Sequence, residues 1–530
     1  MKFTNRFNLI RVRIHPFRAV LFVILFISVS APSIAFSATY TGKPPPTRRL
    51  IAEGEHQYMM RCARCHGERG DGNGQLADLL DPRPRDFTLG MFKFRTTATG
   101  ALPTDEDLFQ TITRGIPGTQ MPSWKELPEQ LRWALVYYVK NYADDFKDAE
   151  LDPYKFVIAL PPKVQSSPES IKKGAELYSK NKCWTCHGNT LRGDGRINLK
   201  NDWDHPVRTP NLTHGWRFKG GSIAEDILYR FVAGMNGSAM PSYADSIKGE
   251  DQWHLANYVA FMAQPGFNQE KVFKASLVKE QIPLNADAAL WHSLPPTKIA
   301  IQGQTSIEPL WINNAVDVVN VRALYNDSEI GLLLEWDDPV RDDVHYRNRE
   351  VKQFKGNYVQ VFGEIPREPG VFRDAIAVQF PVKAQMDRDV SLFRGDQTNP
   401  VNLWIWKTDL VSNANITVEE RNAWGMQLPE KIQPATEHQV RSTAKWKDGR
   451  WRVVMVRPLK TTDQYDVQFA KDRIVPIAFN VWDGSNGEHG LIMGMSSWHL
   501  LYLDDPESDM FDRMKSMLWF FGVSREFSFQ

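Results

Sequence analysis

Two Cys-x-x-Cys-His pentapeptides hold the residues whose types and spacing most clearly suit chemistry. They lie at residues 62–66 and 183–187 and contain all four cysteines of the 530-residue chain. Each is followed by a Gly-rich stretch that ends in Gly-Asp-Gly. Cysteine pairs at this spacing can form a disulfide or bind zinc, and with a following histidine they also suit covalent haem attachment.

The histidine after each pair separates these alternatives. A disulfide leaves it unexplained, and a structural zinc site commonly combines two cysteine pairs, whereas these pairs lie in separate repeats. In haem c, each thiol adds to a vinyl group of the porphyrin and the adjacent histidine reaches the iron. We therefore predict two covalently bound haems, the first held by Cys62, Cys65 and His66 and the second by Cys183, Cys186 and His187.

A methionine stands downstream of each pentapeptide. Met121 lies in "TRGIPGTQMPSW" and Met240 in "VAGMNGSAMPSY", at nearly equal distances after the two histidines and each before a proline. A lone methionine usually fills a core, but this matched pair predicts the sixth iron ligands. His/Met ligation raises the reduction potential of the haem and occupies both axial positions of its iron. Closed sites favour electron transfer over the peroxide chemistry of a dihaem peroxidase, which is the alternative enzyme interpretation.

Helices must position these ligands. Glycine and tyrosine at helical spacing precede each pentapeptide, amphipathic segments at 105–115 and 224–234 precede each methionine loop, and apolar segments at 130–142 and 251–263 follow. In the loops "PRPRDFT" and "RTPNLT", the carbonyl of Pro84 or Pro210 is a candidate acceptor for the ring of the ligating histidine.

These features make residues 48–145 and 168–265 resemble two class I cytochrome c domains in tandem, separated by a linker at 146–167. The resemblance covers both attachment motifs, both Met-Pro loops and the order of the helices. It implies two all-α domains, each with one haem c.

The N-terminus predicts export. Basic residues precede an apolar run at 19–29 and a small-residue site at 35–37, the pattern of a signal peptide at residues 1–37. We expect a periplasmic chain with no transmembrane segment, unless the N-terminus is retained as an uncleaved anchor. The formal net charge of +1 argues against a nucleic-acid partner.

Residues 285–505 change to a strand-like pattern. Short β-rich runs alternate with turn residues such as Asp448-Gly449, which predicts an all-β antiparallel sandwich. Most of the 17 tryptophans lie here and could form an aromatic core or line a flat cofactor. The tail at 506–530 has a helical apolar face, which we expect to pack on the sandwich, with partner docking as the alternative.

This third region resembles the haem b-binding domain of the ethylbenzene dehydrogenase family. The stretches that match are "ALYNDSEIGLLLEWDDP", "AIAVQFP", "NPVNLWIWK", "KDGRWRVVMVRPL" and "VWDGSNGEHG". Proteins with this domain are γ subunits of molybdenum enzymes of the dimethyl sulfoxide reductase type, such as nitrate, selenate and chlorate reductases and nitrite oxidoreductase. The resemblance implies a haem b held between a methionine and a lysine.

The positions of those two ligands carry other residues here. The resemblance places the methionine at Leu403 and the lysine at Met493. Met493 or Met495 could supply one thioether, and Lys407 or His438 would be a ligand only under another alignment. Whether a haem b is retained is therefore open.

The resemblances together imply an electron-transfer subunit with no catalytic centre of its own. It would relay electrons between a molybdopterin catalytic subunit with its iron–sulfur subunit and a respiratory carrier, such as a soluble cytochrome or a quinol-linked protein. A free electron shuttle or sensor, with a β domain used only for binding, is a further alternative.

Overall fold

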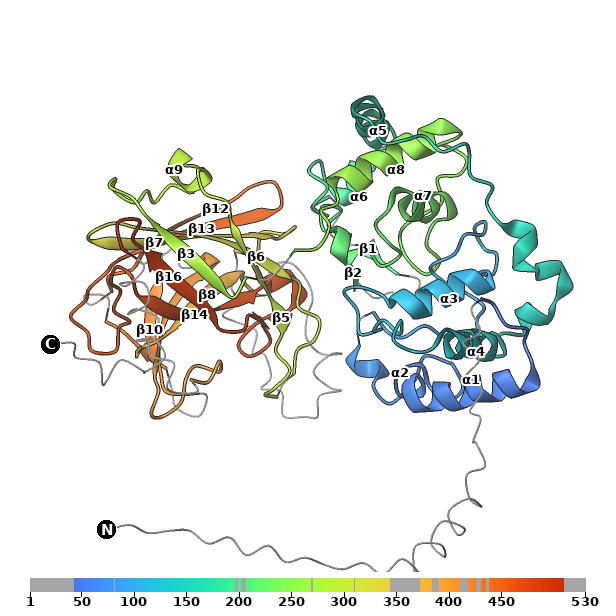
Figure 1. Cartoon of the computed structure of the whole chain (residues 1–530), viewed down its shortest axis with the longest axis horizontal. Helices are drawn as coiled ribbons and strands as arrows, with labels where there is room; N and C mark the ends of the chain where they lie inside the picture. Colours follow the sequence, from blue (N-terminus) through green and yellow to red (C-terminus); the bar gives the residue numbers. More distant parts are fainter. Residues whose placement is uncertain are drawn as a thin grey trace, which may run out of the picture.

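The computed structural model describes residues 42–80, 82–195, 199–201, 206–267, 270–308, 310–343, 372–383, 390–409, 418–425, 430–434 and 438–509. The predicted signal peptide and residues 510–530 of the predicted tail lie outside these ranges. A β-rich half and a helical half lie side by side (Figure 1). No helix within the described ranges has both the length and the apolar character of a membrane span.

Two long helices cross in the first helical region. Its helices are α1 (Arg48–Arg61), α2 (Ala63–His66), α3 (Asp105–Arg114) and α4 (Glu129–Lys140), with the 3-10 turns η1 (Ala77–Leu79), η2 (Asp144–Lys147), η3 (Ala149–Leu151) and η4 (Pro153–Phe156). A Cβ at Gly54 would lie 2.1 Å from the carbonyl oxygen of Ala134, so only glycine allows α1 to approach α4 this closely. Helix α3 begins with a capping box between Thr104 and Asp107.

The second helical region repeats this arrangement. Its helices are α5 (Pro168–Lys180), α6 (Trp184–His187), η5 (Gly215–Arg217), α7 (Ala224–Ala233) and α8 (Glu250–Met262). A Cβ at Gly174 would lie 2.1 Å from the carbonyl oxygen of His254, the counterpart of the first crossing. The region also contains the antiparallel strands β1 (Leu199–Lys200) and β2 (Pro206–Val207), so the prediction of an all-α domain is not confirmed here.

The third region is built from strands. They are β3 (Val272–Leu277), β4 (Thr297–Ala300), β5 (Gln302–Gly303), β6 (Val318–Tyr325), β7 (Glu329–Asp337), β8 (Ala375–Pro381), β9 (Val401–Lys407), β10 (Glu419–Ala423), β11 (Lys431–Ile432), β12 (Arg441–Trp446), β13 (Arg450–Pro458), β14 (Ile474–Trp482), β15 (Gly494–Met495) and β16 (His499–Asp504), with the short helices α9 (Ala289–His292) and η7 (Gly484–Asn486).

These strands form one continuous sheet in the order β11-β10-β9-β8-β14-β16-β3-β6-β7-β13-β12. Strand β14 joins two layers, because residues 478–482 pair with β8 whereas residues 474–477 pair with β16. Strand β3 runs parallel to both β16 and β6. The predicted antiparallel sandwich is therefore only partly reproduced: two layers face each other, but they are hydrogen bonded through β14 and include parallel pairs.

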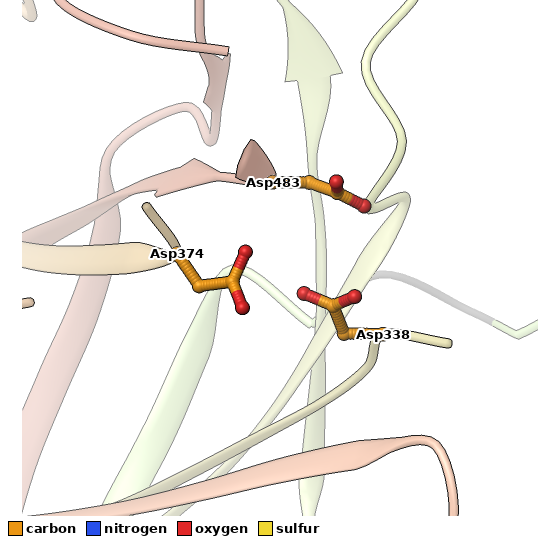
Figure 2. A group of neighbouring side chains, drawn as sticks. All are labelled: Asp338, Asp374 and Asp483. Carbon is orange, nitrogen blue, oxygen red and sulfur yellow. The ribbon is translucent and has the colours of Figure 1, made fainter. Parts of the chain in front are cut away.

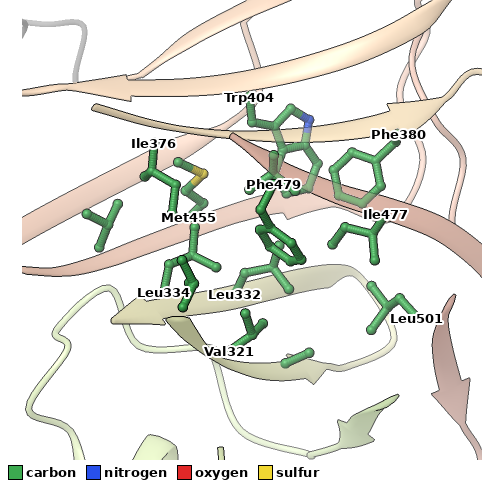
Figure 3. Packing of buried hydrophobic residues seen from close by; sticks show 14 of the residues in the cluster. Val321, Leu332, Leu334, Ile376, Phe380, Trp404, Met455, Ile477, Phe479 and Leu501 are labelled. Atoms are coloured by element: carbon green, nitrogen blue, oxygen red, sulfur yellow. The ribbon is translucent and has the colours of Figure 1, made fainter. Parts of the chain in front are cut away.

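The main core lies between these two layers (Figure 3). Leu332 and Leu334 extend from one layer toward Ile376 and Phe479 of the other, and all four are fully buried. Side chains of alternate residues face opposite ways along a strand, so the remaining residues of β8 and β9 form a second cluster on the outer face of their layer. Part of the predicted tryptophan lining is thus ordinary core, with Trp336, Trp404 and Trp406 fully buried in the main cluster.

Candidate functional site

The first pentapeptide borders an apolar pocket. Cys62, His66 and Met121 all line this pocket, so the structure brings the predicted attachment and axial residues of the first site together. The other lining residues are Tyr58, Phe87, Ile112, Trp124, Leu135 and Val139. Cys65 lines a larger cavity, which shares Cys62, His66 and Met121 with this pocket.

The ring of His66 is held from two sides. Its Nδ1 lies 3.1 Å from the carbonyl oxygen of Arg85, and the ring stacks on Phe87 with centroids 4.6 Å apart. The acceptor is therefore the residue after the predicted Pro84, whose own carbonyl instead contacts the Gly-Asp-Gly turn, 2.8 Å from where a Cβ of Gly72 would lie. Burial lowers the pKa of His66, which keeps the imidazole neutral, the form that binds a metal.

The second site has the same components. Cys183 and Met240 both pack against the core of the second helical region. The Nδ1 of His187 lies 3.5 Å from the carbonyl oxygen of Pro210, the acceptor predicted from the sequence. Burial lowers the pKa of His187 to about 4, so this imidazole is also neutral.

A tyrosine anchors each pentapeptide to the preceding helix. The hydroxyl of Tyr58 donates to the carbonyl of Gly67, and the hydroxyl of Tyr178 donates to that of Gly188, each at 2.7 Å. Both glycines have positive φ, 78° and 75°, which glycine adopts without strain. The repeated Gly and Tyr spacing was visible in the sequence, but this hydrogen bond was not predicted.

The four cysteines are unpaired thiols. Burial raises the pKa of Cys62 to about 12 and that of Cys183 to about 11, so both are neutral beside apolar neighbours. Within the described ranges, neither pentapeptide belongs to a group of three or more His, Cys, Asp or Glu side chains close enough to share a metal ion. This geometry supports neither the disulfide nor the structural zinc alternative.

Trp124 supplies a further test of whether a haem suits the first pocket. Its ring lines the pocket, and its buried Nε1 has no hydrogen-bond partner. A buried indole N–H normally finds an acceptor, and a haem propionate is an acceptor of the required kind. The residues present therefore fit a haem. Trp124 was not predicted as a site residue, although it follows Met121 in "MPSW" as Tyr243 follows Met240 in "MPSY".

A cavity of about 1780 Å³ connects the three regions. It is lined by His66 and Met121 of the first site and by Pro210, whose carbonyl faces His187 of the second site. Asn313 and Asp337 of the β region complete its wall. The first candidate haem site therefore borders a space that also reaches the loop supporting His187 and the β region.

Ionic contacts fix the second helical region against the β region. His214 lies 3.0 Å from a carboxylate oxygen of Asp337 and 3.4 Å from one of Asp317. Burial alone would lower the pKa of His214, but these two carboxylates raise it to about 9. Arg208, directly after β2, donates two hydrogen bonds of 2.6 and 2.8 Å to the buried carboxylate of Asp483.

The candidate haem b residues lie on the outer face of the β8 and β9 layer. Met493 and Leu403, the two positions implied by the family resemblance, are buried in one apolar cluster with Ala375 and Ala377. Met495 lies two residues on, in β15, and is also buried. Lys407 donates to Glu419 at 2.7 Å. At these positions the chain thus offers a thioether but not the Met/Lys pair that the resemblance implies.

Sequence comparisons define the class of the protein. Residues 49–139 match the family profile described as "Cytochrome C oxidase, cbb3-type, subunit III", and residues 171–262 match "Cytochrome c". The chain therefore contains two cytochrome c domains. Residues 288–423 and 409–492 match "Ethylbenzene dehydrogenase". The β region accordingly belongs to the ethylbenzene dehydrogenase family, a match that also suggests haem b, and the recognition made from the sequence is confirmed.

Two curated relatives match less than half of this chain. A protein described as a candidate heme subunit of a respiratory nitrate reductase, from Haloferax mediterranei, is 26% identical over 46% of this chain and 76% of its own length. The chlorate reductase subunit gamma of Ideonella dechloratans is 27% identical over 41% of this chain and 78% of its own length.

One solved structure adds a match at higher identity. A chain of the Kuenenia stuttgartiensis reducing HAO-like protein complex is 37% identical, with 42% of this chain and 100% of that chain covered. The TM-score is 0.39, and nothing about function follows from this likeness.

Proposed function

We propose that this chain is a periplasmic electron-transfer subunit of a molybdenum-containing oxidoreductase. The observation that carries the proposal is that His66 and Met121 line one apolar pocket, while in the second domain Met240 packs against the same core as Cys183 of the second pentapeptide. A haem c with both axial positions occupied exchanges electrons but does not activate oxygen or peroxide. This ligand pattern favours electron relay over the dihaem peroxidase alternative.

The chain's own residues would hold each haem rigidly. The two thiols of each pentapeptide would form the thioether bonds, and the carbonyls of Arg85 and Pro210 would orient the histidine rings that face them. Tyr58 and Tyr178 tie the pentapeptides to the long helices. A rigid surrounding favours electron transfer because few protein groups move when the charge on the haem changes.

The relatives suggest the partners. One relative is a gamma subunit of chlorate reductase and another is described as a nitrate reductase heme subunit. By analogy, we propose that this chain assembles with a molybdopterin catalytic subunit and an iron–sulfur subunit, and that a soluble cytochrome or a quinol-linked carrier exchanges electrons with its haems. The predicted signal peptide at residues 1–37 supports the periplasmic location.

Purification of the tagged full chain from its native host tests the assembly. We expect a large subunit and an iron–sulfur subunit to copurify, with molybdenum in the metal analysis. A chain that purifies alone without molybdenum would favour the shuttle alternative. The enzyme alternative would gain support if the reduced protein bound carbon monoxide or turned over peroxide, because both reactions need an open iron site.

A further inference from the structure

Three buried aspartates meet at one end of the β domain. Asp338 directly follows β7, Asp374 directly precedes β8, and Asp483 directly follows β14. Each offers a carboxylate oxygen within 4.8 Å of the others, and none is more than 1% exposed. Figure 2 shows the three carboxylates directed toward a common space. Asp338 and Asp483 lie in "EWDDP" and "VWDGSNGEHG", within two of the stretches that match the family.

Two of the three carboxylates are well supplied with donors. Asp374 accepts hydrogen bonds from the backbone N–H of Gly484 and Asp342 and from the Nε1 of Trp451, at 2.8 to 2.9 Å. Asp483 accepts from Arg208 and from the backbone N–H of Asn486. Both side chains are therefore held in fixed orientations.

Asp338 differs from its two neighbours. Its Oδ1 accepts from the backbone N–H of Val340 at 3.1 Å, but its buried Oδ2 has no hydrogen-bond partner. A buried carboxylate oxygen without a donor is costly, so an unpaired one in a fully buried side chain indicates that another group satisfies it. The direction of this carboxylate, into the space between the other two, shows where that group would sit (Figure 2).

The charges of the cluster indicate the sign of the missing group. Burial and the neighbouring carboxylates raise the pKa of Asp338 and that of Asp374, whereas Arg208 holds the pKa of Asp483 below its usual value despite burial. Asp342 and Glu488 are buried beside these residues as well, so the carboxylates outnumber the one guanidinium and leave an excess of negative charge in a region shielded from water. Either protons or a further cation must balance it.

We propose that Asp338, Asp374 and Asp483 bind a divalent cation of the calcium type. The donor set consists of carboxylate oxygens alone, which suits calcium and other hard cations rather than zinc or copper. Ligands at the usual calcium distance lie up to about 5 Å apart across the ion, which is compatible with the observed spacing. A carboxylate oxygen can also accept an N–H while it coordinates, so the existing hydrogen bonds would orient the ligands.

The cation would join parts of the chain that are far apart in the sequence. It would fix the ends of β7, β8 and β14 together and thereby hold Asp483 in place for Arg208 of the second cytochrome domain. Its loss would loosen the β domain at the surface on which that domain docks. The site is independent of the proposed electron-transfer function, and its test does not rely on turnover.

Metal analysis and thermal unfolding of the full haem-loaded chain test the proposal. After purification in a calcium-containing buffer and gel filtration, we expect one calcium per chain, removable by chelator. The Tm of the chelated protein should rise with the logarithm of the calcium concentration, since a ligand that binds only the folded state stabilises it by mass action. Absence of bound divalent metal together with an unchanged Tm would overturn the proposal and assign the balancing charge to protons.

Asp338→Asn tests the assignment to these residues, because it keeps the shape and removes the unpaired charge. We expect the variant to lose both the bound calcium and the calcium-dependent rise in Tm. Glu420→Gln is the matched control, since Glu420 is equally buried and accepts from Arg457 at 3.2 Å outside the cluster. It should lower the Tm and retain the calcium response. An Asp338→Asn protein that still responds to calcium would overturn the site, and the wild-type measurements decide the question if the variant does not fold.

Discussion

The two cytochrome c domains share their local construction but differ in what surrounds them. Each has a tyrosine bonded to the glycine after the pentapeptide and a glycine at the crossing of its long helices. The second domain docks directly on the β domain through Arg208 and His214. The first domain contacts the second. Its Arg95 donates to the carbonyl of Ala233, and its Arg114 pairs with Asp226.

A short strand pair distinguishes the second domain here. The segment between its Gly-Asp-Gly turn and its histidine-supporting loop contains β1 and β2. This pair ends directly before Arg208, which it presents to Asp483. The two cytochrome c domains therefore have different neighbours: the second is fixed to the β domain, and the first is attached to the second.

Removal of one haem should give the largest difference between the two cytochrome c domains. In Cys183→Ala/Cys186→Ala, we expect one covalent haem per chain in place of two, because each domain has its own core. Cys62→Ala/Cys65→Ala should also retain one. Acid-acetone extraction followed by pyridine haemochrome assay measures the count. Only the first of these variants should increase hydrogen exchange at residues 206–217, and equal exchange in both would contradict the proposed asymmetry.

Alkaline pH should loosen the second domain from the β domain. The pKa of His214 is about 9 in the folded protein and near 6.5 when unfolded, so its stabilising contribution is complete below pH 6.5 and is lost as the pH rises through 9. The contribution can reach about 3 kcal/mol. Asp317 and Asp337 are the carboxylates that face it, and these pair in turn with Arg192, Arg217 and Arg450.

Hydrogen exchange at residues 210–217 between pH 6 and pH 10, corrected for the intrinsic rate, measures this contribution. In His214→Gln, the dependence on pH should be largely lost. His56→Gln, on the exposed face of α1 in the first domain, is the control and should leave it unchanged. A wild-type protein with flat protection up to pH 10 would show that the ion pairs of His214 do not hold the interface.

Removal of Arg208 should have a smaller effect on the same interface. Arg208→Ala leaves the carboxylate of Asp483, which is 1% exposed, without its guanidinium partner. We expect the free energy of unfolding to fall by about 2 kcal/mol, because the guanidinium itself is partly exposed. Arg114→Ala, which breaks the exposed pair between the cytochrome domains, should cost less than about 1 kcal/mol. Denaturant unfolding of the full chain measures both values, and a larger loss in Arg114→Ala would reverse the comparison.

Exchange of a sixth ligand should change one potential at a time. Met121→His or Met240→His should lower the potential of one haem by on the order of 0.1 V, since axial ligands tune haem potentials over about 0.8 V and imidazole favours ferric iron. Spectroelectrochemical titration measures the shift, and the ferric Met-to-iron charge-transfer band should fall by about half. Met60→His, at an exposed methionine, is the control. Unchanged potentials in both ligand variants would show that these methionines are not ligands.

Local patterns predicted the two cytochrome c domains better than they predicted the junctions. The attachment motifs, the Met-Pro loops and the long helices are each encoded in a few adjacent residues, so their types and spacing were sufficient to predict these domains. Arg208 and Asp483 lie 275 residues apart, and the residues adjacent to each in the sequence do not indicate that the two side chains pair. The parallel strand β3 was missed for a similar reason, because its pairing with β16 depends on how the whole sheet closes.

The β domain gives the smallest expected effect and the sharpest contrast with the cytochrome domains. Each cytochrome domain supplies a histidine and a methionine, whereas the expected haem b position supplies Met493 packed beside Leu403. A thioether alone is a weak ligand, so we expect acid acetone to extract no stoichiometric haem and Met493→Ala to leave the visible spectrum unchanged. Met495→Ala should behave alike. One extractable haem per chain that disappears in Met493→Ala would contradict this prediction and would show that the domain keeps its family cofactor with Met493 as a ligand.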